Sequence, residues 1–289
     1  MLPINYIDIF KDRLLIITGV GRSGTSIIGK LISTMDPVYY LYEPALMKYG
    51  DPSNLNEFLG ILLEDYFLPL VQGRGNMNPV DWSYQGNQMT LDEIERRRRL
   101  LPRRRDAMAF IEKEKPLYVV KIPEYQSHVG MFPAWVKWLN VIRDGRAVVQ
   151  SSLALGWFTD EWCNEQMIEP CFEGSIFAVP YYTESVGSPC DWSTWNPATR
   201  AACAWRSLIE WGTPFETSVV KYEDFTADPT AFCKRATATY SISLTSLSTS
   251  CIVGVENNRN EADKFDLETI AEPERTRFIQ TNRALGYMV

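Results

Sequence analysis

Short apolar runs alternate along the chain with longer segments in which apolar residues recur at helical spacing. The runs have the length of buried strands. We expect strands at 14–19, 38–41, 117–122, 139–143 and 217–222. We expect helices at 26–34, 54–70, 90–113, 144–155, 199–212, 229–240 and 267–285. This alternation predicts an α/β fold of three layers, P-loop-like, with a central parallel sheet flanked by helices.

The length of 289 residues is enough to bury a large core, and we expect one domain over 1–289. The segment 157–198 interrupts the pattern with several Pro and Gly and no long periodic run. Its tryptophans are Trp157, Trp162, Trp192 and Trp195. Aromatic rings in such an insertion suit an acceptor-binding lid, because they stack on sugar faces or apolar chains. A satellite core beneath a long loop explains the same residues equally well.

Composition and charge exclude several functions. Hydrophobic residues make up 45% of the chain and charged residues 22%, which is ordinary for a soluble globular protein. The formal net charge of −7 argues against nucleic-acid binding. No apolar run reaches the length of a membrane helix, and the first residues lack the parts of a signal peptide. We therefore expect a cytoplasmic protein with no membrane span.

The cysteines and the single histidine narrow the chemistry. The six cysteines show no CxxC spacing, and we expect reduced, partly buried thiols. In an oxidising compartment the candidate pairs are Cys163–Cys171 and Cys190–Cys203. His128 is the only histidine, which makes a His-based zinc site or a Ser/His triad implausible. We expect no metal.

One segment is strongly basic although the chain as a whole is acidic. Residues 96–99 and 103–105 place seven arginines within ten residues. Thr90 and Glu93 have the spacing of a capping box, which starts a helix that is interrupted near Pro102. One interpretation is a solvated helix face with internal ion pairs. The other is a patch for an anionic acceptor or for the rim of a nucleotide site.

The segment 14–26 carries the strongest chemical signal, because an apolar strand, a glycine-rich loop and a helix start follow one another. Glycines let backbone N–H groups turn onto an anion, and the helix N-terminus adds a partial positive charge. The loop therefore predicts a phosphate cradle. Thr25 stands where a Walker A loop requires Lys, and the cation of this loop comes earlier, at Arg22.

This loop resembles the 5′-phosphosulfate loop of sulfotransferases that use 3′-phosphoadenosine-5′-phosphosulfate (PAPS). In that family Lys or Arg precedes Ser-Gly-Thr at this point. The resemblance implies that Arg22, Ser23, Gly24, Thr25 and Ser26 bind the 5′ end of the donor.

The segment 136–152 again runs strand, turn, helix, and it resembles the 3′-phosphate motif of the same family. The core of that motif is Arg-Asp-x-Arg, followed by a helix start and Ser. Arg143 lies at the strand end and Ser151 eight residues later on the helix, so a charge and a hydroxyl can converge on one phosphate. A solvated turn with local ion pairs is the alternative interpretation.

Two further segments extend the resemblance. Residues 39–44 resemble the Leu-[Phe/Tyr]-Glu-Pro segment of carbohydrate sulfotransferases that act on 6-hydroxyls. Tyrosylprotein sulfotransferases also place a Glu about this far beyond the loop, which implies that Glu43, 21 residues after Arg22, is the general base. Residues 219–229 resemble the Tyr-Glu-Asp-Leu-x-x-Asp-Pro segment found late in these enzymes, which implies that Tyr222 faces the nucleotide.

The resemblance implies transfer of the sulfuryl group from PAPS to an acceptor hydroxyl, with adenosine 3′,5′-bisphosphate (PAP) as product and a carbohydrate as expected acceptor. We expect burial near Pro44 and several tyrosines to raise the pKa of Glu43 toward the working range. Arg22 then stabilises charge at the leaving oxygen. Lys121 resembles the Lys of a Lys-[Asp/Thr]-Pro segment and assists, although Ile122 departs from that pattern. Fixed cations supply the charge, without a metal.

Several alternatives stay open. His128 is a rival base, since sulfotransferases for phenols and steroids use a His. Their Gly- and Lys-rich C-terminal nucleotide motif is missing here, and Arg259 and Lys264 are its candidate substitutes. A P-loop kinase or nucleoside-triphosphatase needs Lys after Gly24, where Thr25 stands, and a non-catalytic nucleotide-binding protein is the third class. Small-molecule, lipid and peptide hydroxyls are alternative acceptors, and the oligomeric state is open.

Overall fold

The computed structural model describes nearly all of the predicted elements of the first two-thirds of the chain, together with the C-terminal helix. The described residues are 5–33, 37–44, 54–74, 91–165, 189–212, 218–232, 235 and 262–289. Most of the predicted insertion at 157–198 and most of the predicted helix at 229–240 therefore lie outside the described residues.

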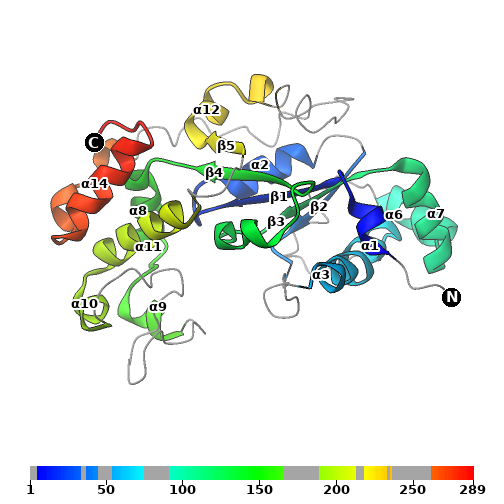
Figure 1. Cartoon of the computed structure of the whole chain (residues 1–289), viewed down its shortest axis with the longest axis horizontal. Helices are drawn as coiled ribbons and strands as arrows, with labels where there is room; N and C mark the ends of the chain where they lie inside the picture. Colours follow the sequence, from blue (N-terminus) through cyan, green and yellow to red (C-terminus); the bar gives the residue numbers. More distant parts are fainter. Residues whose placement is uncertain are drawn as a thin grey trace.

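The centre of the molecule is a sheet of five parallel strands (Figure 1). In spatial order the strands are β2 (Val38–Tyr42), β3 (Leu117–Lys121), β1 (Leu14–Gly19), β4 (Lys137–Ile142) and β5 (Ser218–Lys221). The predicted parallel sheet is thus confirmed. Because β1 is central and all strands run the same way, their carboxyl ends meet at one edge, where ligands of such sheets bind.

Successive residues of β1 point to opposite faces of the sheet, because the side chains of a strand alternate. Leu14 and Ile16 belong to one buried cluster, and Leu15 and Ile17 to another. All four are fully buried, as expected for a strand covered on both sides. The sequence therefore shows a continuous apolar run here instead of an alternating one.

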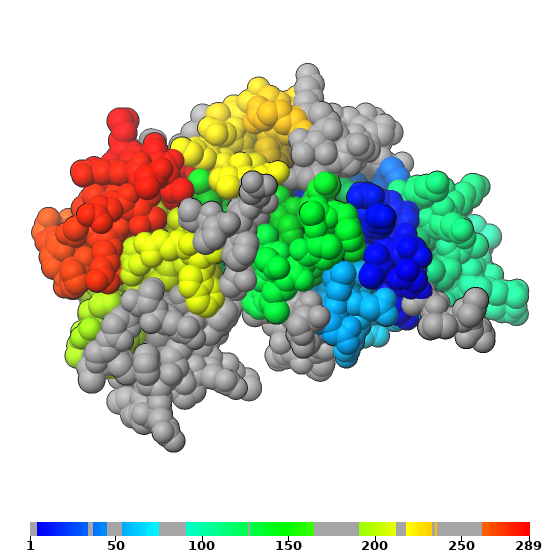
Figure 2. All heavy atoms as spheres, in the orientation of Figure 1, coloured from blue at the N-terminus to red at the C-terminus, as the bar shows by residue number. Residues whose placement is uncertain are grey.

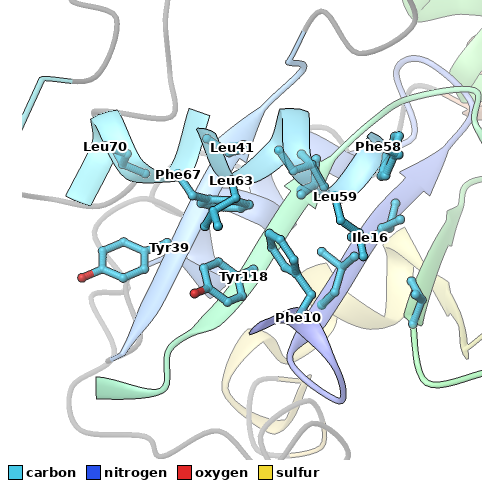
Figure 3. Close-up of a cluster of buried hydrophobic side chains, with 14 of the residues drawn as sticks. Phe10, Ile16, Tyr39, Leu41, Phe58, Leu59, Leu63, Phe67, Leu70 and Tyr118 are labelled. Carbon is cyan, nitrogen blue, oxygen red and sulfur yellow. The ribbon is translucent and has the colours of Figure 1, made fainter. Parts of the chain in front are cut away.

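The first cluster, which we call the α3 cluster, packs rings from α1 and the α3 region onto β3 (Figure 3). The ring centroids of Phe10 and Phe67 lie 4.6 and 4.8 Å from that of Tyr118. The helices on this face are α1 (Tyr6–Phe10), α3 (Leu55–Ile61), a π-helical segment (Leu62–Phe67), α4 (Leu68–Val71) and α7 (Arg104–Glu114). The predicted helix at 54–70 is confirmed.

The opposite face is covered by α2 (Thr25–Ile32) and α12 (Tyr222–Ala227). Gly29 brings α2 close to the sheet, since a Cβ at this position would lie 2.4 Å from the hydroxyl of Tyr40. Helix α2 therefore packs directly against β2.

A third buried cluster lies beyond the carboxyl edge of the sheet and contains Trp192, Trp205 and Phe278. Helix α11 packs on α8 and α14 there, at one end of the molecule (Figure 1). The helices are α8 (Gly145–Leu153), α9 (Asp160–Glu165), α10 (Pro189–Thr194), α11 (Pro197–Gly212) and α14 (Glu274–Ala284). A buried ion pair joins α11 to α14, with Arg206 Nε 2.7 Å from Glu274 Oε1.

The C-terminal helix is shorter than predicted. The pattern at 267–285 predicts one helix, but α14 begins at Glu274, after Pro273 at its N-cap. Proline has no N–H to continue a helix from the N-terminal side, so the residues before it form a separate 3₁₀ turn, Leu267–Thr269. Among the described helices, none combines the length and the apolar character that a bilayer crossing requires.

The arginine-rich segment forms α6 (Leu91–Leu100) and α7, at the end of the molecule opposite α14 (Figure 2). Arg97 donates to the hydroxyl of Tyr39 at 2.9 Å, close to the start of β2, which places the segment at the amino edge of the sheet. Arg96 and Arg97 both pair with Glu93. The interpretation as internal ion pairs fits these contacts, whereas the rim of a phosphate site would lie at the carboxyl edge.

Candidate active site

The loop between β1 and α2 has the geometry of an anion cradle. Gly24 is the N-cap of α2 with a φ of 88°, and a Cβ there would lie 2.2 Å from Cδ2 of Tyr222. Only glycine fits both the left-handed backbone and the ring above it. Among the described residues, no side chain caps the N-terminus of α2, which begins at Thr25. The positive end of the helix therefore faces the loop, as an anion site requires.

Ser23 also fits a bound oxyanion. Its side chain is fully buried, and its Oγ has no hydrogen-bond partner within the described part of the chain. A buried hydroxyl without a partner costs free energy, which a ligand oxygen at this position would recover. Thr25 is buried and Ser26 half-buried at the start of the helix. The loop residues named from the sequence are thus assembled around one helix N-terminus.

Arg22 connects the loop to the second predicted phosphate motif. Its Nε donates to Ser151 Oγ at 3.1 Å, across 129 residues of sequence. Its backbone carbonyl accepts a hydrogen bond from Nη1 of Arg143, also at 3.1 Å. Arg22 has a left-handed backbone, with φ at 70°, and an exposed side chain. The structure therefore brings Arg22 and Arg143, which follow strand ends, together with Ser151 of the helix α8, as the two motifs predict.

Arg143 and Tyr222 form one wall of a pocket of about 270 Å³. The guanidinium carbon of Arg143 lies 4.7 Å from the ring centroid of Tyr222, within cation–π range. Arg143 is 6% exposed. The remaining lining residues are Asp144, Arg146, Ala147, Glu223, Thr226, Ala227, Ala262 and Asp263. The pocket borders the phosphate loop, because Tyr222 also contacts Gly24.

The segment at 219–229 is tied to the start of α8. Glu223 Oε1 accepts from the backbone N–H of Asp144 at 3.0 Å, and its Oε2 accepts from the hydroxyl of Tyr287 at 2.9 Å. Lys264, a candidate nucleotide contact, is exposed on a short 3₁₀ helix, Ala262–Lys264, next to the pocket. Arg259 lies outside the described residues.

Glu43 and Lys121 form an ion pair at the ends of neighbouring strands. The Lys121 side chain is 4% exposed and that of Glu43 is 42% exposed. The expectation that Glu43 is buried is therefore wrong: β2 ends at Tyr42, and the chain turns outward at Glu43 with φ at 44°. Lys121 Nζ also lies 4.7 Å from the ring of Tyr42. Burial lowers the pKa of Lys121, and the nearby carboxylates of Glu43 and Glu124 oppose that shift.

Glu124 belongs to the same edge and was missed in the sequence. Its backbone N–H donates to the carbonyl of Gly19 at 2.9 Å, and its φ is 59°. A Cβ placed on Gly21 would lie 3.2 Å from Glu124 Oε1, so the carboxylate reaches the phosphate loop. The sequence could have pointed to Glu124, because this carboxylate follows Pro123 at the end of a strand that was already expected to carry a site residue. Left-handed non-glycine residues tend to gather at functional sites.

His128, the rival base, packs against the α3 cluster. It is half-buried on a 3₁₀ helix, Gln126–Met131. Its ring stacks on that of Tyr125, with centroids 4.2 Å apart, and Tyr125 belongs to the α3 cluster. Phe132, at the end of the same 3₁₀ helix, is also buried in this cluster. Burial lowers the pKa of His128.

The described cysteines are free and buried, at Cys163 and Cys203. Burial raises the pKa of both thiols, that of Cys203 to about 12, which makes them inert packing residues. The side chains of the other four cysteines are outside the described part of the chain.

Comparison with known proteins identifies the fold. No protein-family model matches the sequence. A search of curated proteins finds no significant match. The sulfotransferase domain of the Synechococcus PCC 7002 olefin synthase superposes with a TM-score of 0.52 at 12% identity, over 96% of this chain and 95% of that domain.

Two further solved structures are similar at lower scores. The sulfotransferase domain from the curacin biosynthetic pathway gives a TM-score of 0.49 at 13% identity, over 96% of this chain and 98% of its own. The sulfotransferase STF1 from Mycobacterium tuberculosis H37Rv gives 0.45 at 14%, over 96% and 78%. From the olefin synthase domain alone it follows that the chain has the fold of a sulfotransferase domain, as the sequence predicts.

Proposed function

We propose that this chain is a sulfotransferase that moves a sulfuryl group from PAPS to an acceptor hydroxyl. The observation that carries the proposal is the hydrogen bond from Arg22 Nε to Ser151 Oγ. It joins two motifs that the sequence assigns to opposite ends of one donor, the 5′-phosphosulfate and the 3′-phosphate. A donor with two separated anionic groups needs such paired sites on one fold.

In this proposal, positively charged groups and hydrogen-bond donors bind the two anionic ends of the donor. Ser23, Gly24, Thr25 and Ser26 bind the 5′ end through the loop and the N-terminus of α2. Arg143 and Ser151 bind the 3′-phosphate, since the serine hydroxyl can donate to a phosphate while it accepts from Arg22. Tyr222 lines the pocket beside Arg143 and faces the nucleotide. When bound, PAPS supplies the sulfuryl group and departs as PAP.

Three residues carry the chemistry in this proposal. The Glu43 carboxylate removes the proton of the acceptor hydroxyl as the new S–O bond forms. Lys121 holds that carboxylate in place through the ion pair and contributes positive charge at the reacting end of the loop. Arg22 stabilises the negative charge that develops on the leaving bridging oxygen as the old S–O bond breaks. The charge is balanced by fixed side chains.

The acceptor we propose is a hydroxyl on a carbohydrate or glycoconjugate. Support comes from the resemblance of residues 39–44 to the segment that carries the base in carbohydrate sulfotransferases. The exposed Glu43 side chain gives a large, polar acceptor access to the base. We further propose that 157–198 contributes to acceptor binding. A small-molecule, lipid or peptide hydroxyl is the runner-up acceptor.

Two measurements test the proposal. Thermal denaturation is followed with PAP in the absence of magnesium and, separately, with Mg-ATP. PAP without magnesium is expected to raise the thermal midpoint. A rise with Mg-ATP and none with PAP would instead favour a kinase. Sulfuryl transfer is then measured with ³⁵S-labelled PAPS against oligosaccharides, phenols, long-chain alcohols and tyrosine peptides. Labelling confined to one of the last three classes would replace the carbohydrate assignment and keep the sulfotransferase.

A further inference from the structure

The chain returns to the phosphate loop directly after α8. The helix ends at Leu153, and the backbone N–H of Trp157 donates back to the carbonyl of Ser152 at 3.1 Å. Gly156 and Phe158, on either side of Trp157, have left-handed backbones with φ at 73° and 65°. These two turns project the Trp157 side chain from the end of the helix that carries Ser151.

The Trp157 ring contacts two consecutive residues of the loop. The guanidinium carbon of Arg22 lies 5.9 Å from the ring centroid, within cation–π range. At Gly21, a Cβ would lie 3.2 Å from Cζ3 of the same ring. Trp157 also stacks on Trp162 of α9, with centroids 6.2 Å apart and an interplanar angle of 26°. The ring is thus supported by a neighbouring element while it contacts the loop.

Arg22 therefore has two side-chain contacts from the same end of α8. Ser151 accepts from Nε, which fixes the in-plane direction of the guanidinium, and the indole ring limits its tilt. A long, exposed arginine otherwise samples many rotamers, and a cation stabilises a transition state best when it is already in position. The planar guanidinium stacks on aromatic faces, which the compact ammonium of a lysine does not reproduce.

We propose that Trp157 is a positioning residue for Arg22 and that it acts on catalysis only through the guanidinium. This inference rests on the proposed function, and it assigns Trp157 a part in sulfuryl transfer other than the aromatic platform for an acceptor that the sequence suggests. Trp157 holds the cation in place. The inference assigns no such role to the other tryptophans of 157–198.

The test is a double-mutant cycle that combines Trp157→Leu with Arg22→Lys. In the Arg22 background, Trp157→Leu is expected to lower kcat about tenfold with an unchanged Kd for PAP, and Trp157→Phe is expected to restore most of the loss. In the Arg22→Lys background, Trp157→Leu is expected to change kcat less than twofold. An equal loss in both backgrounds, or a loss confined to PAP affinity, would overturn the assignment.

Trp135→Leu is the matched control, because Trp135 is partly buried against the α3 cluster at the amino edge of the sheet. It is expected to lower the thermal midpoint without changing kcat. A kcat loss in this variant equal to that in Trp157→Leu would mean that packing alone explains the effect.

A second readout separates this inference from the proposed function. In protein labelled with 5-fluorotryptophan, the ¹⁹F resonance that Trp157→Phe removes is expected to shift in Arg22→Lys, while the Trp135 resonance does not move. If wild-type protein transfers no sulfuryl group, the proposed function fails, and the fluorine shift still decides whether Trp157 holds Arg22. An unshifted resonance in an active enzyme overturns the inference alone.

Discussion

Lys121 and Glu43 meet because two parallel strands end side by side. Tyr42 of β2 is in register with Lys121 of β3, and the backbone N–H of Glu43 donates to the carbonyl of Lys121 at 2.9 Å. The pairing of the two strands therefore makes these side chains neighbours, although they are 78 residues apart in sequence. The lysine is buried, and the carboxylate is the member of the pair that a molecule in solution can reach.

Replacing Glu43 by Gln tests the base. Gln keeps the size and polarity of the side chain but cannot accept a proton at neutral pH. The Kd for PAP is expected to stay near that of the wild type, and kcat for transfer to an alcohol is expected to fall about a hundredfold or more. Calorimetry and the ³⁵S assay measure the two quantities.

His128→Ala is the control for that experiment. Its ring packs on Tyr125, so its removal is expected to change kcat only a few-fold. A large loss in His128→Ala together with an active Glu43→Gln would make His128 the base and bring the enzyme nearer to the phenol and steroid sulfotransferases.

Arg22→Ala is expected to lower kcat by roughly a hundred- to a thousandfold, because the missing cation acts on charge that grows in the transition state. Arg22→Lys is expected to recover part of the activity, since related loops use Lys at this point. Steady-state kinetics with saturating donor measure the effect. Wild-type turnover in Arg22→Ala would show that the early cation of this loop has no catalytic role.

Arg143→Ala and Ser151→Ala are expected to differ in a measurable way. Loss of Arg143 removes the proposed charge-assisted hydrogen bond to the 3′-phosphate, which is worth about 1.5–3 kcal/mol of PAP affinity. Loss of Ser151 weakens PAP binding too, but it also frees the Nε of Arg22 and so lowers kcat. Calorimetry and kinetics on both variants separate the effects.

Arg277→Ala is the matched control for the two variants, because Arg277 is exposed on α14 and distant in sequence from both motifs. Arg277→Ala is expected to leave both the affinity for PAP and kcat unchanged. If Arg143→Ala binds PAP as tightly as the wild type, the 3′-phosphate does not bind at this strand end.

The fold and most of the candidate site could be predicted from the sequence because they depend on local patterns. The short apolar run at 14–19, ended by glycine, predicts a strand buried on both faces, and a glycine loop before a helix predicts the cradle. Arg143 and Lys121 follow from the rule that parallel strands present their carboxyl ends together. Chain order and strand ends were enough to place these residues at one edge.

The features that could not be predicted depend on tertiary contacts, which produce no periodic pattern in the sequence. The exposure of Glu43 follows from a left-handed turn at a non-glycine residue, which the sequence does not mark. The same holds for Glu124, whose importance comes from its reach to Gly21. His128 looks like a loop residue because the cluster that holds its segment, around Phe132, is assembled from distant parts of the chain.

The buried ion pair between α11 and α14 makes a stability prediction. Arg206 is 3% exposed and Glu274 is 1% exposed, with contacts of 2.7 and 3.0 Å between guanidinium and carboxylate. Glu274→Ala leaves a buried cation whose one remaining anionic partner among the described residues is the exposed Glu210, so the free energy of unfolding is expected to fall by about 3 kcal/mol. Urea denaturation measures it. Glu268→Ala, which removes a largely exposed carboxylate that pairs with Arg275 of the same helix, is expected to leave the midpoint almost unchanged.

The pH dependence of turnover is expected to report on Lys121. Burial lowers its pKa, while Glu43 and Glu124 raise it in partial compensation. A lysine stabilises negative charge only as a cation, so kcat is expected to fall as the pH rises through this lowered pKa. Glu124→Gln removes a carboxylate that favours the cation. The pKa of Lys121 then drops further, and the alkaline fall of kcat moves to lower pH.

Glu112→Gln is the control for this shift, because it removes the same charge from an exposed position on α7, at the amino edge of the sheet. Its alkaline limb is expected to coincide with that of the wild type. The measurement is kcat from pH 7 to about 10.5 at saturating donor, where a free lysine would lose its proton. An alkaline limb in Glu124→Gln that stays in place, or moves to higher pH, would mean that Lys121 does not act as the titrating cation. Equal shifts in Glu124→Gln and Glu112→Gln would assign the effect to net charge instead of to the contact at this edge.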